Sequence, residues 1–163
     1  MLDLEYRATA IVVRMRTAPN AALTAELLDS VAEAIAYIGP HRAIVLTGTG
    51  GIFAPDLDAA DGPGRAAARA RLPRVLSALR THRLPVVAAV NGDATGAGYA
   101  LADAADLRVM SAGTIQPSSW TGRRYSAPDA LAVGLIDQRC APAELIAQAL
   151  RHVAAPRPDA VAS

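Results

Sequence analysis

The 163-residue chain contains no lysine, so its sixteen basic residues are all arginines, and fifteen acidic residues leave a formal net charge of +1. Without lysine, Schiff-base chemistry on a side-chain amine and phosphate binding by a P-loop lysine are both excluded. A single cysteine, Cys140, excludes an internal disulfide, and three scattered histidines show no metal-ligand spacing. The sequence therefore predicts no metal site and no bound cofactor.

Aromatic residues are also few, at 4% of the chain. Six arginines gather in one segment and raise the question of nucleic-acid binding: Arg65, Arg69, Arg71, Arg74, Arg80 and Arg83. Only one aromatic residue, Phe53, lies between Tyr37 and Tyr99, so there is little to stack against bases. We expect no nucleic-acid partner. The arginines form either a solvated helix face or a positively charged surface that attracts an anionic ligand.

No apolar run approaches the roughly 20 residues that a membrane span needs, and the first residues lack the basic start and apolar stretch of a signal peptide. We therefore expect a cytoplasmic protein with no membrane partner. The length, with 52% hydrophobic residues, fits one globular domain. We expect that domain over residues 1–153 and a frayed tail over residues 154–163.

Short β-branched runs predict buried strands, and segments with apolar residues at helical spacing follow them. The predicted strands are 9–15, 43–46, 84–90 and 107–110. Thr24 is placed to cap a helix that stops at Gly39, and a second, arginine-bearing helix is expected with Pro73 in its first turn. Continuous apolar strands that alternate with helices predict an α/β fold with parallel pairing, covered on both faces.

The last third of the chain is less regular. Residues 111–125 form a polar stretch without a clear period. A short helix over 127–133, an extended segment over 135–139 and a helix that begins at Pro142 complete the predicted pattern.

Two longer segments point to one protein family. Residues 43–58 read A-I-V-L-T-G-T-G-G-I-F-A-P-D-L-D, and residues 84–111 read L-P-V-V-A-A-V-N-G-D-A-T-G-A-G-Y-A-L-A-D-A-A-D-L-R-V-M-S. They resemble the two halves of the acyl-CoA site in the crotonase (enoyl-CoA hydratase/isomerase) superfamily. Residues 19–23 and 126–137 resemble an earlier and a later segment of the same superfamily. The resemblance implies the ββα spiral fold of that superfamily, here with a truncated C-terminal helical region.

The resemblance also implies an acyl-CoA thioester as substrate or ligand, whose carbonyl oxygen is held by two backbone N–H groups that form an oxyanion hole. Such fixed donors stabilise an enolate by several kcal/mol. Gly96-Ala97-Gly98 stands where the superfamily has a glycine triplet, which places one donor on Ala97, at the start of a helix. By the same resemblance, Gly96 and Gly98 belong to the substrate-binding residues.

The position of the second donor depends on how residues 53–58 align with the superfamily. Without a gap, the N–H of Leu57 is the donor, Asp56 replaces a glycine, and Phe53 and Asp58 take substrate-binding positions. With a two-residue deletion, the donor position falls on Pro55, which has no N–H. We favour Leu57, because that alignment needs no deletion.

The hydratases of the superfamily use two glutamates across the substrate double bond as general acid and base. The first falls on Ala100 in this chain, and residues 111–126, where the second is expected, contain no acidic residue. Asp56, Asp93 and Asp103 are the remaining candidates for a catalytic carboxylate, and each is also readily explained as a loop, turn or helix-end residue.

Two functions fit this pattern. One is an acyl-CoA-binding enzyme that uses enolate or oxyanion chemistry and is not an efficient hydratase. The other is a non-catalytic accessory or degenerate subunit that binds an acyl-CoA or a partner protein. We also expect a homo-oligomer, because shortened C-terminal helices would leave apolar surface partly uncovered around Trp120, Leu145, Ile146 and Leu150. The resemblance to the superfamily favours a trimer.

Overall fold

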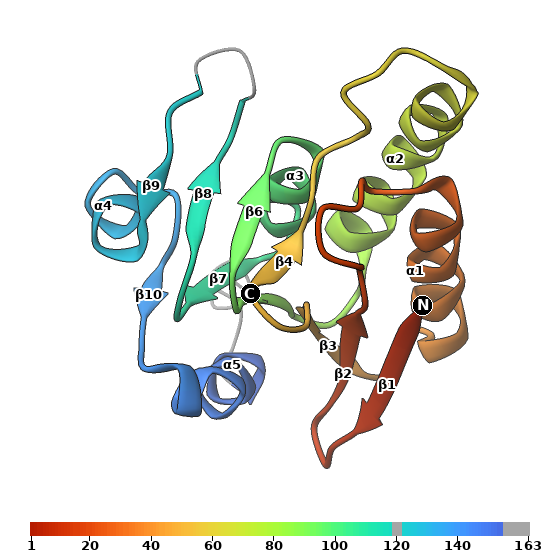
Figure 1. The fold of residues 1–163 in the computed structure, drawn as a ribbon. Coiled ribbons are helices and arrows are strands. Elements are labelled where there is room, and N and C mark those ends of the chain that lie inside the picture. The colour runs from red at the N-terminus through yellow and green to blue at the C-terminus, as the bar shows by residue number, and fades with distance from the viewer. Residues whose placement is uncertain (119–121, 155–163) are drawn as a thin grey trace.

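The computed structural model describes residues 1–118 and 122–154, which form an α/β domain with two sheets (Figure 1). The larger sheet has six strands in the order β1 (Leu2–Tyr6), β2 (Ala10–Met15), β3 (Ala43–Thr47), β5 (Val86–Val90), β7 (Leu107–Met110) and β10 (Gln138–Arg139). The smaller sheet has four strands in the order β4 (Ile52–Ala54), β6 (Asp93–Thr95), β8 (Thr114–Gln116) and β9 (Tyr125–Ser126). The helices are α1 (Ala25–Ile38), α2 (Pro63–Thr81), α3 (Ala97–Asp103), α4 (Ala127–Ala132) and α5 (Leu145–Ala154), with a 3₁₀ turn at Pro142–Glu144.

From β3 onward the chain winds as a spiral in which each turn contributes strands to both sheets and then a helix. Strands β3 and β4 precede α2, strands β5 and β6 precede α3, and strands β7, β8 and β9 precede α4. Pairing is parallel from β2 through β10 in the larger sheet and from β4 through β8 in the smaller one. The ββα spiral and the parallel pairing predicted from the sequence are therefore confirmed, while β1 and β9 add antiparallel edges.

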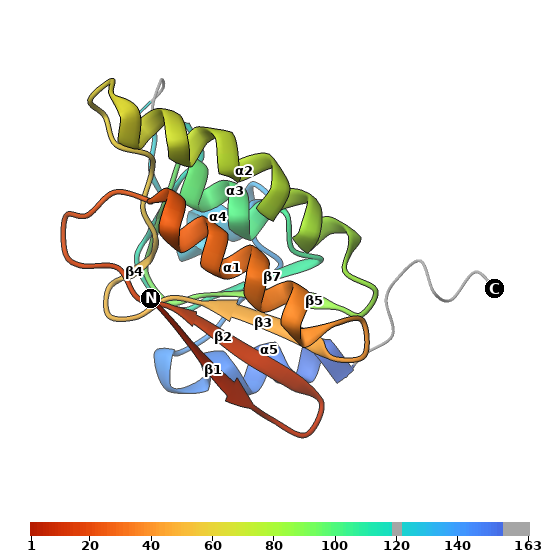
Figure 2. The same cartoon turned by 90° about the vertical axis from the view of Figure 1, so that its right-hand side faces the viewer.

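The centre of the larger sheet is buried on both faces, because every residue of β3 and β5 is buried. Alternate residues of β3 face opposite sides: Ile44 and Leu46 belong to the core under α1, α2 and α3, whereas Ala43 and Val45 face α5. Figure 2 shows α1, α2 and α3 on one side of the sheet and α5 on the other. Each fully buried valine or leucine stabilises the fold by roughly 1.5–3 kcal/mol relative to exposure.

The two long helices begin at different kinds of residue. The Thr24 hydroxyl accepts a hydrogen bond of 3.1 Å from the Leu27 N–H and caps α1, as predicted. Helix α2 begins at Pro63, so the expectation that Pro73 lies in its first turn is wrong. Pro63 needs no N–H at the first helical position, whereas Pro73 lies inside α2, where it removes one hydrogen bond and its ring crowds the carbonyl four residues earlier.

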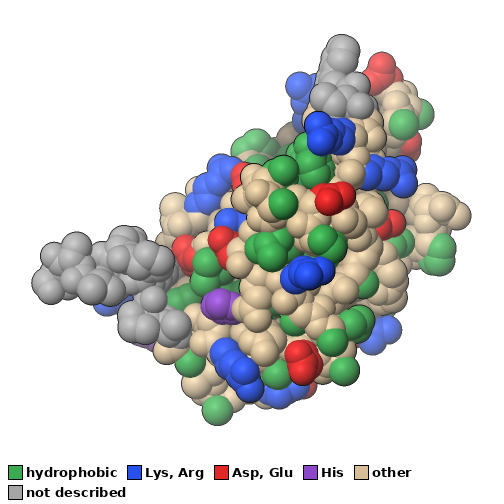
Figure 3. Space-filling model, turned by 90° about the vertical axis from the view of Figure 1, so that its left-hand side faces the viewer, with side chains coloured by type: hydrophobic (Ala, Val, Ile, Leu, Met, Phe, Trp, Pro, Cys, Tyr) green, Lys and Arg blue, Asp and Glu red, His purple; other side chains and the backbone are tan. Residues whose placement is uncertain are grey.

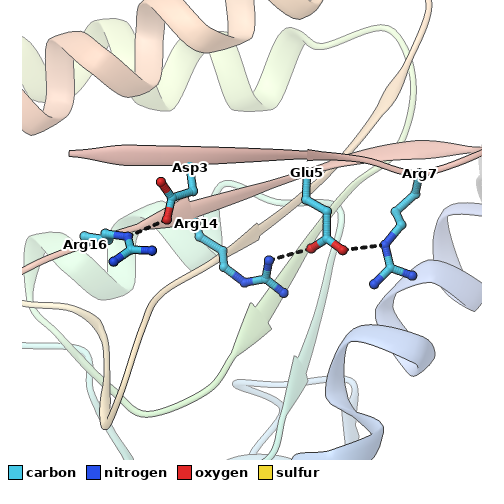
Figure 4. A network of polar contacts seen from close by, with 5 residues as sticks. All are labelled: Asp3, Glu5, Arg7, Arg14 and Arg16. Atoms are coloured by element: carbon cyan, nitrogen blue, oxygen red, sulfur yellow. Dashed lines mark hydrogen bonds and ion pairs between the residues drawn. The ribbon is translucent and has the colours of Figure 1, made fainter.

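Strand β1 was not expected from the sequence. It pairs antiparallel with β2, with Leu4 opposite Val13, and turns Leu2 and Leu4 towards the core. Its other face carries Asp3 and Glu5, which form ion pairs with three arginines shown in Figure 4: Arg7, Arg14 and Arg16. These pairs lower the pKa of the exposed Glu5 carboxyl, mainly through hydrogen bonds from Arg14 and then Arg7.

Helix α5 covers apolar surface that we expected to be open. Leu145 is only 4% exposed, so its exposure was wrongly predicted, and Ile146 and Leu150 pack at the edge of the same cluster. Trp120 lies outside the described residues. On the face shown in Figure 3, hydrophobic side chains form small areas separated by charged and other residues. Among the described residues, no helix is long and apolar enough to cross a membrane.

Candidate functional site

The two segments with family-like sequence meet at one edge of the smaller sheet. Strands β4 and β6 are parallel neighbours, with Ala54 paired to Ala94, so the segments that follow these two strands leave the sheet at the same end. The turn 55–57 follows β4, and Gly96 and the first residue of α3 follow β6. The carboxyl ends of parallel strands are where α/β folds commonly bind ligands.

Two backbone N–H groups converge at this edge on a single oxygen atom. The Leu57 N–H donates to Oδ1 of Asp56 over 2.8 Å, and the Ala97 N–H donates to the same Oδ1 over 3.0 Å. We call these two N–H groups the donor pair. Leu57 and Ala97 are the two donors that the alignment without a gap predicts, and here both donate to this one atom. The geometry also shows that the pair accommodates one anionic oxygen, which here belongs to the half-buried side chain of Asp56.

Two glycines allow the two halves to come this close. A Cβ added to Gly98 would lie 2.1 Å from the Ala54 carbonyl oxygen and 2.6 Å from that of Pro55. A Cβ added to Gly96 would lie 2.3 Å from Cγ of Asp56, and Gly96 has a φ of +53°. Helix α3 therefore packs directly on the backbone that follows β4, and the Asp56 carboxyl fills the space above Gly96.

Asn91 holds the loops that lead to both halves. Its Oδ1 accepts from the Gly48 N–H over 2.9 Å, and its Nδ2 donates to the carbonyls of Gly50 and Ile52 over 3.0 and 3.2 Å. These bonds fasten the start of β4 to the turn between β5 and β6. Asn91 was not among the site residues predicted from the sequence, because its role as a link depends on the fold.

The comparisons with known proteins agree with this arrangement. The sequence model described as enoyl-CoA hydratase/isomerase matches residues 5–116, which include both halves of the site. The chain belongs to the enoyl-CoA hydratase/isomerase family. A probable enoyl-CoA hydratase, echA6, of Mycobacterium tuberculosis is 40% identical over 92 residues, and a probable enoyl-CoA hydratase, echA12, of Mycobacterium leprae is 34% identical over 126 residues.

The aligned part of this chain spans less than half of those relatives, 38% and 43% of their lengths. Solved structures show the same fold over nearly all of the chain. An enoyl-CoA hydratase/isomerase family protein from Silicibacter pomeroyi has a TM-score of 0.82 at 21% identity and covers 97% of this chain and 84% of its own. Pseudomonas aeruginosa DspI has a TM-score of 0.79 at 24% identity, with 94% and 78% covered.

Ala100, where the resemblance to the family's hydratases predicts the first glutamate, lies on α3 three residues after Ala97. Its N–H donates to the Gly96 carbonyl, and its methyl group supplies neither an acid nor a base. Because α3 carries both the Ala97 donor and Ala100, the missing carboxylate belongs to the same short helix as one member of the donor pair.

The candidate carboxylates have different surroundings. Oδ1 of Asp93 accepts from the N–H and hydroxyl of Thr114, at 2.8 and 3.2 Å, so it links β6 to β8. Asp103 is exposed at the end of α3, where its charge adds to burial, the larger cause, in raising the pKa of Tyr99. Of the three candidates, Asp56 is the one whose carboxylate contacts the donor pair.

The predicted substrate-binding residues are not all accessible. Phe53 is fully buried in the core, so its side chain positions β4 and does not reach a ligand in this conformation. Asp58 is exposed, and its Oδ1 accepts from the Ala60 N–H over 3.0 Å. It also lines a cavity of about 120 Å³ with Leu23, Thr24, Glu26, Gly64 and other residues near the starts of α1 and α2.

Among the described residues, neither the Cys140 thiol nor a cluster of metal-ligating side chains provides a second reactive centre. Burial, and then Glu144, raises the pKa of the Cys140 thiol, which keeps it protonated and poorly nucleophilic near neutral pH. Within residues 1–118 and 122–154, no cluster of three His, Cys, Asp or Glu side chains is arranged to hold a metal ion.

Proposed function

We propose that the chain binds an acyl-CoA thioester, with the thioester carbonyl oxygen at the donor pair, and that it is not an efficient hydratase. The observation that carries this proposal is the convergence of the Leu57 and Ala97 N–H groups on one oxygen, at 2.8 and 3.0 Å. Both distances lie in the range that such donors need to stabilise a developing oxyanion. Family membership supports the choice of an acyl-CoA as the ligand.

Chemistry at this site would consist of polarising the carbonyl. Two fixed N–H groups favour the enolate over the neutral thioester, and they need no reorganisation when charge develops. Adding a proton to the α-carbon or removing one from it would still need an acid or a base, and Ala100 provides neither. Proton transfer at the α-carbon would therefore fall to a group other than Ala100, and the Asp56 carboxylate is the candidate that contacts the donor pair.

Isothermal titration calorimetry with acyl-CoAs of several chain lengths tests the proposal, with saturation-transfer NMR for weak ligands. We expect binding of at least one thioester, with an affinity above that for CoA alone, because only the acyl-CoA has a thioester carbonyl for the donor pair. The proposal fails if no CoA species binds by either method at millimolar concentration, where a Kd of 1 mM corresponds to about −4.1 kcal/mol.

A second function is favoured by two specific observations. Ala100 replaces a catalytic glutamate, and the Asp56 carboxylate occupies the donor pair. Both fit a non-catalytic accessory subunit that binds an acyl-CoA or a partner protein. Thioester binding without turnover of any acyl-CoA tested would favour this second function over an enzyme.

Assembly into a trimer stays a prediction. Its basis is now the family alone, because α5 is packed on the chain's own sheet and Leu145 is buried there. Helix α4 and the residue after it leave Leu131 and Val133 exposed, at 38% and 57%, which is little apolar surface for an interface. Light scattering is expected to give about three times the chain mass, and a constant mass near 16.8 kDa on concentration would contradict a trimer.

A further inference from the structure

The Asp56 carboxylate lies where the proposed function puts the ligand oxygen. Its Oδ1 accepts both N–H groups of the donor pair, one from the next residue and one from the start of α3, 41 residues away in sequence. The Asp56 carbonyl is fixed separately by the Leu23 N–H over 2.9 Å. The backbone at residue 56 is therefore anchored, while rotation of the side chain alone would release the donor pair.

We propose that Asp56 is an internal competitor for the acyl carbonyl and so determines which ligands the donor pair accepts. This inference rests on the proposed function, since it concerns the same two N–H groups. With the carboxylate in place, both N–H groups already donate to Oδ1 of Asp56. A thioester carbonyl reaches them only in molecules whose Asp56 side chain has turned away.

Charge decides the competition in favour of Asp56. Hydrogen bonds to an ionised acceptor are roughly twice as strong as those between neutral partners, and a thioester carbonyl is neutral in the ground state. The carboxylate is also tethered, so it is present at the site at a high effective concentration. The apparent affinity for the thioester equals the intrinsic affinity multiplied by the fraction of molecules in which the donor pair is free of Asp56. An enolate is anionic and therefore competes better than the neutral ligand.

Replacing Asp56 tests this directly, because the position above Gly96 is then empty. Asp56→Gly is expected to bind butyryl-CoA at least about tenfold more tightly than the unmodified chain does, a change of about 1.4 kcal/mol. Asp56→Asn keeps an oxygen at the same place without the charge, so a smaller gain is expected. Asp61→Gly is the matched control, since Asp61 lies in the same loop and is exposed. Its carboxylate lies 3.9 Å from the guanidinium of Arg65, a long and exposed ion pair.

The ligand control separates competition from a general charge effect. S-butyl-CoA has the same charges as butyryl-CoA but no thioester carbonyl, so loss of a negative charge at residue 56 would improve binding of both equally. Competition by Asp56 improves binding of butyryl-CoA alone. Amide NMR provides a readout without ligand: the Leu57 and Ala97 N–H signals are expected to move upfield in Asp56→Gly, with the rest of the spectrum preserved.

Three outcomes are distinguishable. A gain for butyryl-CoA with Asp56→Gly, and none for S-butyl-CoA, supports the inference. Equal effects on the two ligands, or no effect while butyryl-CoA still binds, overturn the inference and leave the proposed function standing. If neither the unmodified chain nor any variant binds a CoA species, the proposed function is wrong and the inference falls with it.

Discussion

Crotonyl-CoA is expected to remain almost entirely unhydrated by this protein. Each positioned acid or base contributes about 10² to 10⁴ to the rate of such a reaction, and Ala100 removes one of them outright. The second is absent from residues 111–126, where the sequence has no Asp or Glu. The expected rate is therefore lower than that of a two-glutamate hydratase by at least about 10² and by up to about 10⁸ if the two losses multiply.

Loss of absorbance of the conjugated thioester measures this rate, with a two-glutamate family hydratase as the positive control in the same buffer. Ala100→Glu is a useful second variant, because it restores one carboxylate on α3 while Asp56 still occupies the donor pair. We expect Ala100→Glu alone to stay inactive. Efficient turnover by the unmodified chain would show that another group performs the acid and base steps, and Asp56 would be the first to examine by substitution.

The larger sheet was predictable because each of its central strands can be recognised from its own residues. Residues 43–46 and 86–90 are apolar runs long enough to indicate buried strands without reference to anything else, and both lie in observed strands. Thr24 likewise predicted the start of α1 from local chemistry. Strand β1 also had a readable pattern, since Leu2 and Leu4 alternate with Asp3 and Glu5.

The smaller sheet was not readable in this way. Strands β4, β6 and β8 have three residues each, too few for a period, and their pairing depends on turns held by Asn91 and by close glycine contacts. The resemblance to the family indicated where the donor pair lies, but not its contact with Asp56. That contact depends on which way one side chain rotates, and two N–H groups from distant parts of the chain decide it.

Gly98→Ala is expected to destabilise the fold strongly, because the added Cβ would lie 2.1 Å from the Ala54 carbonyl oxygen. That atom is backbone at the end of β4, so no side chain can move aside and α3 must shift as a whole. Overpacking a close contact typically costs 1–3 kcal/mol, and we expect about 3 kcal/mol here. For a chain of this length, that loss lowers the Tm by roughly 6–12 °C.

Gly64→Ala is the matched control, since it makes the same chemical change in a helix where nothing lies within 4 Å of the added Cβ. Its Tm is expected to stay the same or rise slightly, because alanine reduces the freedom of the unfolded chain. A shift of α3 also moves the Ala97 N–H away from Oδ1 of Asp56, so the Ala97 amide signal should change in Gly98→Ala and not in Gly64→Ala. Equal melting temperatures for the two variants would mean that α3 does not rest on β4 as closely as the structure has it, and the donor pair would lose its geometric basis.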